Sequence, residues 1–230
     1  MLDNYVKSGR LKVLTKGVYA RSELTISEWQ AIAISLDRMK VPVYVGGLSA
    51  LEIAGNAQYL QLGDQRTVQL YCDSACPRWM DGVLRSLPAI KFSWHKISRI
   101  WYQNLAQLAH CKELVWRNEY EPFRAASLEQ AILEVLHEVP EQTSFEHADQ
   151  LMQGLVNLSP KRLDILLLNC RSIKAKRLFF WLADRHQHSW RESLDASKYD
   201  LGSGKRVIQT GGRLVAKYGI TVPKDMVGNE

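Results

Sequence analysis

The chain has 230 residues, of which 46% are hydrophobic and 23% charged, as in an ordinary globular protein with a real apolar core. This length fits one large domain or two small ones. No run of about 18 apolar residues is present, which excludes a membrane-spanning helix. The start of the chain lacks the apolar stretch of a signal peptide, so we expect the four cysteines to lie in the reducing cytoplasm.

The net charge of +6 is unevenly distributed. Residues 1–22 carry five Lys or Arg and one Asp, and residues 161–220 carry thirteen Lys or Arg and five Asp or Glu. Residues 125–160 hold six carboxylates and no Lys or Arg. Two basic regions around an acidic block favour an anionic partner such as nucleic acid, although a solvated basic surface gives the same pattern.

The first 22 residues combine a short helix with a basic hairpin. The apolar spacing predicts a helix over residues 2–8, and Gly9 can end it in a left-handed C-cap. Residues 10–20 then alternate around a turn at Thr15–Gly17. This order is typical of the recognition helix and wing of a winged helix-turn-helix, whose helix enters the major groove while the wing lies along the DNA backbone. The predicted DNA-contacting residues are Asn4, Lys7, Arg10, Lys12 and Lys16.

A complete winged-helix module has two more helices before its recognition helix, and the sequence ahead of Leu2 does not contain them. Three alternatives therefore stay open, which are that the open reading frame begins late, that the chain is a truncated form, or that the hairpin has only a structural role.

The middle of the chain predicts a small mixed sheet with helices. A helix is predicted at residues 27–39 and another at 100–108, because apolar residues recur there at helical spacing. The predicted strands are Val41–Val45, Arg66–Asp73, Ala89–His95 and Glu113–Arg117. These elements indicate an α+β core.

Gly46 and Gly47 lie between a predicted strand and a predicted helix. Such a junction can present backbone N–H groups to phosphate, as in nucleotidyltransferases, which then require a D-x-D carboxylate pair for metal. Asp73 ends the next strand without a second carboxylate two residues away. We therefore predict no nucleotidyltransferase-like catalysis, and expect the glycines to serve tight strand–helix packing.

No other arrangement predicts a catalytic or metal site. Cys72 and Cys76 lack zinc spacing and a second pair, and the six histidines carry no motif around them. We expect no catalytic residues, no metal and no cofactor.

Residues 127–188 predict a compact helical block. Ser127 and Ser159 are expected helix caps, with Pro160 at a helix start that tolerates proline. The last helix of the block carries Lys174, Arg177, Trp181 and Arg185 at i, i+3, i+7 and i+11. This stripe suits an anionic groove or a protein interface. The third alternative is a core Trp181, with Lys and Arg stems covering apolar surface.

A glycine-rich, basic segment follows this helix. Residues 205–209 and 213–222 predict the two strands of a β-hairpin, with the turn at Thr210–Gly212 and a kink at Gly219. The glycines beside Lys205 allow close approach of a partner. The predicted partner- or DNA-contacting residues of the C-terminal part are Arg171, Lys174, Arg177, Trp181, Arg185, Lys205 and Arg206.

The sequence resembles the AbiEi family of antitoxins over nearly the whole chain. The more specific part of the resemblance lies in the C-terminal half. The runs that carry it are Cys170–Ser172, Lys176–Phe179, Trp181–Ala183, Asp200–Arg206 and Tyr218–Pro223, with Tyr5–Gly9, Gly17–Arg21 and Gly46–Glu52 at the front.

The resemblance implies an antitoxin of a type IV toxin–antitoxin system used in abortive phage infection. It implies autorepression, in which an N-terminal winged helix binds inverted repeats of operator DNA. It also implies a C-terminal domain that supports cooperative DNA binding, so a monomer in solution would assemble on DNA. That domain would counter a nucleotidyltransferase-like toxin, without a need for stable toxin binding.

We therefore predict an α+β chain with three parts. These are a partial winged-helix segment (residues 1–22), an α+β N-terminal core (23–124) and a C-terminal antitoxin domain of a helical block and a basic β-hairpin (125–230). Two other functions stay open, which are direct toxin binding without DNA binding and a nucleotidyltransferase-like enzyme.

Overall fold

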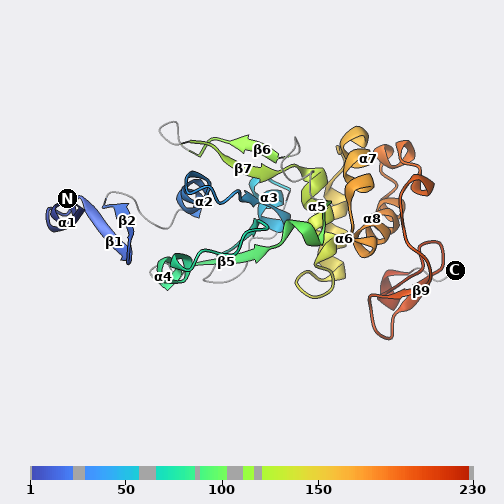
Figure 1. Cartoon of the computed structure of the whole chain (residues 1–230). Helices are drawn as coiled ribbons and strands as arrows, with labels where there is room; N and C mark the ends of the chain where they lie inside the picture. The colour runs from blue at the N-terminus through green and yellow to red at the C-terminus, as the bar shows by residue number, and fades with distance from the viewer. Residues whose placement is uncertain are drawn as a thin grey trace. The chain divides into compact units, whose positions relative to one another are not determined.

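The computed structural model describes residues 2–22, 29–56, 66–85, 89–102, 111–116 and 121–227 (Figure 1). The chain divides into two compact units. Unit 1 contains residues 1–45, 59–96 and 113–124, and unit 2 contains residues 46–58, 97–112 and 125–230. Helices and mixed sheets together confirm the predicted α+β class.

Unit 1 begins with the predicted helix and hairpin. Helix α1 spans Leu2–Lys7, strand β1 spans Leu11–Thr15 and strand β2 spans Val18–Arg21. The two strands pair antiparallel, with Lys12 opposite Ala20. We call residues 2–22 the helix–hairpin segment.

The rest of unit 1 contains most of a mixed sheet of order β5-β4-β3-β7-β6, of which residues 111–112 and 125–126 are assigned to unit 2. Strands β4 and β5 are parallel, and β3 runs antiparallel to β4. The strands are β3 (Tyr44–Val45), β4 (Arg66–Tyr71), β5 (Ile90–His95), β6 (Cys111–Leu114) and β7 (Phe123–Ala126). The helices of this unit are α2 (Trp29–Arg38) and α4 (Trp79–Arg85).

Sequence patterns missed α4 and β7, which are too short for a clear period. Of the helix predicted at 100–108, residues 103–108 lie outside the described residues, as do residues 27–28 and Arg117 of other predicted elements. Trp101 itself forms a β-bridge with Cys170 after a short 3₁₀ turn, η1 (Ile97–Arg99), so the prediction of helix there is wrong.

Unit 2 contains the predicted helical block. Its helices are α3 (Gly47–Ile53), α5 (Leu128–His137), α6 (Phe145–Gly154), α7 (Pro160–Asn169) and α8 (Ile173–His186). At the start of α5, α6, α7 and α8, a serine hydroxyl accepts a hydrogen bond from the backbone N–H three residues later. Leu133, Leu136 and Phe179 are fully buried, which places the core around α5 and α8.

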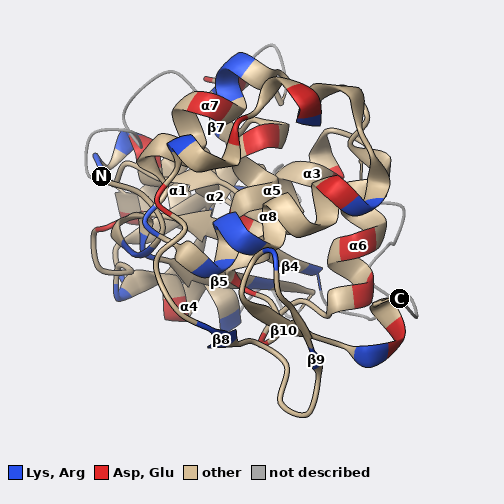
Figure 2. Ribbon diagram, turned by 90° about the vertical axis from the view of Figure 1, so that its right-hand side faces the viewer, with Lys and Arg blue, Asp and Glu red and all other residues tan. Residues whose placement is uncertain are grey.

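After α8 the chain makes 3₁₀ turns and a small sheet (Figure 2). The turns are η2 (Ser189–Ser193), η3 (Ala196–Lys198) and η4 (Lys224–Met226), and the strands are β8 (Arg206–Val207), β9 (Arg213–Val215) and β10 (Ile220–Val222). Strand β10 lies in the middle, antiparallel to β9 and parallel to β8.

The strand pairing of this sheet differs from the predicted one. Residues 205–209 and 213–222 do not form one hairpin, because Gly219 adopts φ of +61° and splits the second run into β9 and β10. The hairpin that closes the block is β9–β10, and the turn at Thr210–Gly212 carries the chain from β8 to β9 instead.

Candidate nucleic-acid interface

The helix–hairpin segment is held together by backbone contacts around Gly9. Gly9 has φ of +71°, which allows the chain to turn out of α1 directly into β1. The Arg10 N–H donates to the Tyr5 carbonyl at 3.0 Å, and the Ser22 N–H donates to the Arg10 carbonyl at 3.2 Å. The Ser22 hydroxyl also donates to the Gly9 carbonyl. Helix and hairpin are therefore one connected piece.

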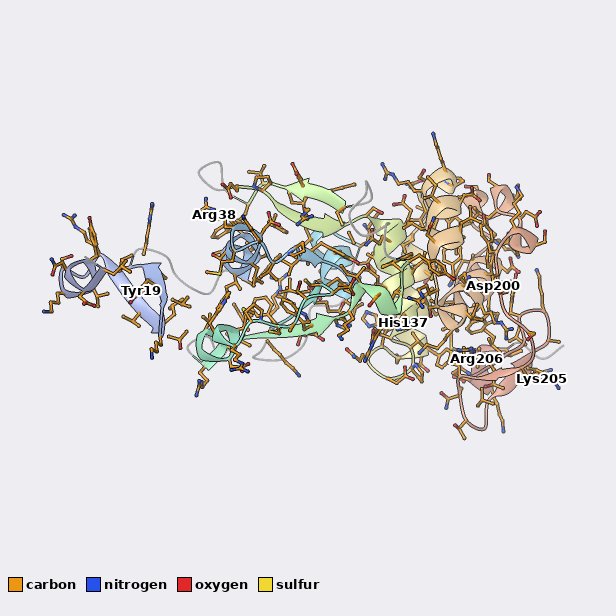
Figure 3. The ribbon with its side chains drawn as sticks, viewed as in Figure 1. Tyr19, Arg38, His137, Asp200, Lys205 and Arg206 are labelled. Atoms are coloured by element: carbon orange, nitrogen blue, oxygen red, sulfur yellow. The ribbon has the colours of Figure 1, made fainter. Side chains whose placement is uncertain are left out.

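The five DNA-contacting residues predicted from the sequence all lie on this piece and are exposed. They are Asn4, Lys7, Arg10, Lys12 and Lys16. None of the four cations has an ion pair with a described residue. Helix α1 buries no residue, so the segment has no core of its own. Figure 3 shows Tyr19 on the hairpin of this segment.

The hairpin packs on α4 at one close contact. A Cβ added to Gly82 would overlap Oγ1 of Thr15, the last residue of β1, and would lie 2.6 Å from its Cβ. On α4, Met80 and Val83 are buried in the core of unit 1. Sequence reasoning missed Gly82 because α4 itself was not predicted, and a glycine inside a helix is informative only once the helix is known.

In the C-terminal part, Arg177 was predicted to lie on a contact stripe and is instead 4% exposed. Its Nε donates to the Leu201 carbonyl at 2.6 Å, and its Nη1 donates to the carbonyls of Gly204 at 2.9 Å and Gly219 at 3.1 Å. A guanidinium offers five N–H donors, which suits it to several carbonyls at once. Arg177 therefore fastens the chain around the small sheet to α8, and the prediction of an external contact is wrong.

Trp181 is also a core residue. It is 8% exposed and packs edge-to-face on Phe145 of α6, with ring centroids 6.4 Å apart. The alternative of a core Trp181 is the one that the structure bears out. An indole has a large apolar surface, and Phe145 of α6 covers part of it.

The two ends of the predicted stripe are occupied by neighbours within unit 2. Lys174 Nζ donates to the Val139 carbonyl at 2.5 Å and to Glu141 at 3.0 Å. Arg185 Nη1 donates to the Met226 carbonyl at 2.6 Å, and its Nε lies 3.2 Å from Asp149. Glu141 and Asp149 belong to the acidic block, so the two oppositely charged regions of the sequence neutralise each other in part. Figure 2 shows the acidic positions of α6 and the basic positions of α8 in this unit.

Asp184 on α8 makes a second attachment for the small sheet. It accepts hydrogen bonds from Lys217 at 2.5 Å and from the Tyr218 hydroxyl, and it forms an ion pair with Arg191 at 2.8 Å. Burial raises the pKa of Asp184, but the hydrogen bonds and the cationic charges outweigh it and leave the pKa below its ordinary value.

Four of the predicted C-terminal contact residues are exposed, namely Arg185, whose contacts are given above, and Arg171, Lys205 and Arg206. Lys205 and Arg206 are exposed at the start of β8 (Figure 3). Arg206 is held by its backbone N–H, which donates to the Gly219 carbonyl at 2.8 Å, so the position of the strand does not depend on its guanidinium. Arg171 is exposed as well, with its guanidinium over the Tyr102 ring and on the Ser98 carbonyl.

The Gly46–Gly47 junction is filled by a carboxylate of the chain itself. Glu134 is fully buried, and its Oε2 accepts a hydrogen bond from the Gly47 N–H at 2.8 Å. Its Oε1 accepts from Trp101 at 3.2 Å and from Gln130 at 2.9 Å. An anion at the start of α3 is thus supplied internally, at the place where a phosphate-binding junction would hold its ligand. Among the described residues, no group of three or more His, Cys, Asp or Glu side chains is arranged to hold a metal.

The helix–hairpin segment and the sheet-plus-helix units define a class of protein, and comparisons with protein families identify it as a transcriptional regulator. Residues 1–62 match the family model described as the transcriptional regulator AbiEi antitoxin N-terminal domain. Residues 65–223 match the family model described as the transcriptional regulator AbiEi antitoxin of type IV toxin–antitoxin systems. The chain therefore belongs to the AbiEi antitoxin family, as the resemblance implied.

A solved structure has the same fold. The crystal structure of the RV2827C protein from Mycobacterium tuberculosis superimposes with a TM-score of 0.62 at 16% sequence identity, and the match covers 95% of this chain and 77% of that chain. No curated protein matches the sequence. Within the described residues, none of the helices has both the length and the apolar character that crossing a membrane requires.

Proposed function

We propose that this antitoxin represses its own operon by binding promoter DNA through the helix–hairpin segment. Asn4 of α1 reads base edges, and Lys7, Arg10, Lys12 and Lys16 contact phosphates. The operator is an inverted repeat, and copies that are monomeric in solution assemble on it cooperatively. Residues 125–230 counter a nucleotidyltransferase-like toxin.

The observation that best supports DNA binding is that the four cations Lys7, Arg10, Lys12 and Lys16 are available to a partner. They are exposed on one connected helix and hairpin, and no described carboxylate pairs with them. A cation without a partner is available to displace the counterions of DNA, whereas one already in an ion pair must first give up its partner. The family membership of residues 1–62 supports the same interpretation.

The proposed DNA binding is tested by measuring the affinity for the operon's promoter DNA by fluorescence anisotropy between 50 and 250 mM salt. Four phosphate contacts predict that log K falls against log salt with a slope of about −3.5. Lys12→Gln together with Lys16→Gln should weaken binding and make the slope about 2 units less steep.

Lys91→Gln with Lys96→Gln is the matched control, because both residues are exposed lysines of unit 1 outside the segment. The control should keep the wild-type slope. Equal weakening by the two double variants would mean that overall charge, and not the wing, makes the contact. Absence of salt-dependent binding by the wild-type protein would refute DNA binding altogether.

A second candidate function is direct binding of the toxin by the basic C-terminal surface. Lys205 and Arg206 favour it, since both are exposed, whereas Lys174, Arg177 and Arg185 of α8 each donate to a backbone carbonyl of the same unit. Co-purification with the toxin of the same operon at 150 mM salt tests it. Loss of the complex in Lys205→Glu with Arg206→Glu supports direct binding, and rescue from toxicity without any complex rejects it.

We infer that the antitoxin does not act by nucleotidyl transfer. The position of Glu134 at the Gly47 N–H supports this, because a bound phosphate would face a buried negative charge there. Transfer of labelled nucleotide that requires Mg²⁺ and disappears in Asp73→Ala would show the inference to be wrong.

A further inference from the structure

Gly82 lies inside α4, where glycine is an unfavourable residue. Its missing Cβ leaves the backbone more freedom in the unfolded chain, which destabilises a helix interior relative to alanine. A glycine at such a position has a packing reason when another group approaches the backbone closely. Here that group is the side chain of Thr15 from the hairpin.

The contact leaves no room for any side chain at position 82. An added Cβ would overlap Thr15 Oγ1 and would lie 2.6 Å from its Cβ and 3.0 Å from its Cγ2. Real Cβ atoms do not approach other atoms this closely, so either the helix or the hairpin must move. Thr15 ends β1, one residue before Lys16 and three after Lys12.

The two sides of the contact differ in how firmly they are held. Helix α4 is anchored by Met80 and Val83, which are 0% and 1% exposed. The helix–hairpin segment has no buried residue to hold it in place. A clash at this contact therefore displaces the hairpin and leaves α4 where it is.

We propose that Gly82 is a positioning residue for DNA recognition, which seats Thr15 on α4 and so fixes the hairpin that carries Lys12 and Lys16. This rests on the DNA contact proposed above. With Thr15 seated, the two lysines and α1 keep one orientation relative to the rest of unit 1, and less ordering remains to be done when the segment binds DNA.

A double-mutant cycle of Gly82→Ala and Thr15→Gly tests the proposal on the full chain. Gly82→Ala alone should lower promoter affinity about tenfold and flatten the salt slope by about 2, the share of two phosphate contacts. In the Thr15→Gly background, where all three crowding atoms are absent, Gly82→Ala should change affinity less than about twofold. An equal effect in both backgrounds overturns the proposal.

Gly154→Ala is the control, because Gly154 is also helical and has nothing within 4 Å of an added Cβ. It should leave promoter affinity unchanged. Rescue from toxicity should be unaffected in Gly82→Ala, since residues 125–230 are not altered, and loss of rescue there would overturn a purely positional role by showing a general folding defect.

Hydrogen exchange of the hairpin amides, residues 10–22, gives a readout that does not need DNA. Exchange that is faster in Gly82→Ala than in wild type, with no further increase when Gly82→Ala is added to Thr15→Gly, supports the packing of Thr15 on α4 even if the protein binds no promoter. Unchanged exchange in Gly82→Ala overturns the proposal that Gly82 positions the hairpin, even if promoter binding is confirmed. Failure of the proposed function and failure of this inference are thus distinguishable.

Discussion

The helix–hairpin segment and helix α8 are both rich in Lys and Arg, yet they use these residues in opposite ways. In the segment, Lys7, Arg10, Lys12 and Lys16 are exposed and unpaired with any described carboxylate. In α8, the cations of the predicted stripe are occupied by carbonyl groups and carboxylates of the same unit.

The difference shows what a basic pattern can mean. Helical spacing defines which residues share a face, but it does not tell whether that face meets solvent or another part of the chain. Helix α8 is followed by a small three-stranded sheet, and contacts from a buried guanidinium to backbone carbonyls attach that sheet to the helix. The cations of the helix–hairpin segment make no such contacts with described residues, so they stay available.

The largest effect is expected at Arg177. Arg177→Met keeps much of the side-chain volume but leaves the carbonyls of Leu201, Gly204 and Gly219 without their donor. We expect a loss of about 3–5 kcal/mol in the free energy of unfolding, because hydrogen bonds to a charged group are worth about 1.5–3 kcal/mol each and are not fully additive. Urea unfolding measures it.

Lys12→Met is the matched control for Arg177→Met, as it also replaces a cation with an unbranched apolar side chain. Lys12 is exposed on β1, and its variant should unfold within about 0.5 kcal/mol of wild type. Similar losses in the free energy of unfolding in the two variants would mean that Arg177 is no more important for stability than an exposed cation of the helix–hairpin segment.

Glu134→Gln is expected to have the next largest effect. The amide of the new side chain has one acceptor oxygen and one NH₂ donor, so it cannot accept from Gly47, Trp101 and Gln130 together as the carboxylate does. We expect a loss of about 2–3 kcal/mol in the free energy of unfolding, measured in urea. A gain in stability would mean that the buried charge costs more than its hydrogen bonds return.

A smaller, pH-dependent effect is expected from His137 at the end of α5. His137 forms a 2.8 Å hydrogen bond with Ser172, and burial lowers its pKa from the ordinary value of 6.5. The neighbouring charges partly cancel, since Glu138 and Glu141 raise the pKa while Lys174 and Arg99 lower it. The unfolded chain therefore takes up protons before the folded chain does, and stability that is present above about pH 6.5 is lost as the pH falls below it.

Urea unfolding at pH 7.5 and pH 5.5 checks this prediction. Wild type should lose more stability on acidification than His137→Asn, whose amide oxygen can still meet the Ser172 hydroxyl. The His137→Asn variant should still lose part of its stability on acidification, because burial also lowers the pKa of His147. Equal losses in both proteins would mean that His137 does not titrate differently on folding.

Local chemistry made much of this fold predictable. The helix–hairpin segment could be identified because Gly9 and Gly17 sit at turn positions, and the helical block because Ser127 and Ser159 cap its helices. The pairing of β8 with β10 could not be identified, since parallel partners are chosen by contacts that the local pattern does not contain. For the same reason the burial of Arg177 was missed, because its three acceptors lie 24 to 42 residues further along the chain.

The smallest effect on stability is expected at Lys205 and Arg206, which are the part of the C-terminal region that behaves like the helix–hairpin segment. Both are exposed at the start of an edge strand, and the strand is held by backbone contacts that their side chains do not make. Lys205→Gln with Arg206→Gln should unfold within about 0.5 kcal/mol of wild type. If these cations contact a partner, rescue from toxicity should fall in this variant while promoter binding by the helix–hairpin segment persists. Intact rescue at unchanged stability would mean that Lys205 and Arg206 contact no partner needed for rescue. The helix–hairpin segment would then be the region whose exposed cations are proposed to bind a partner.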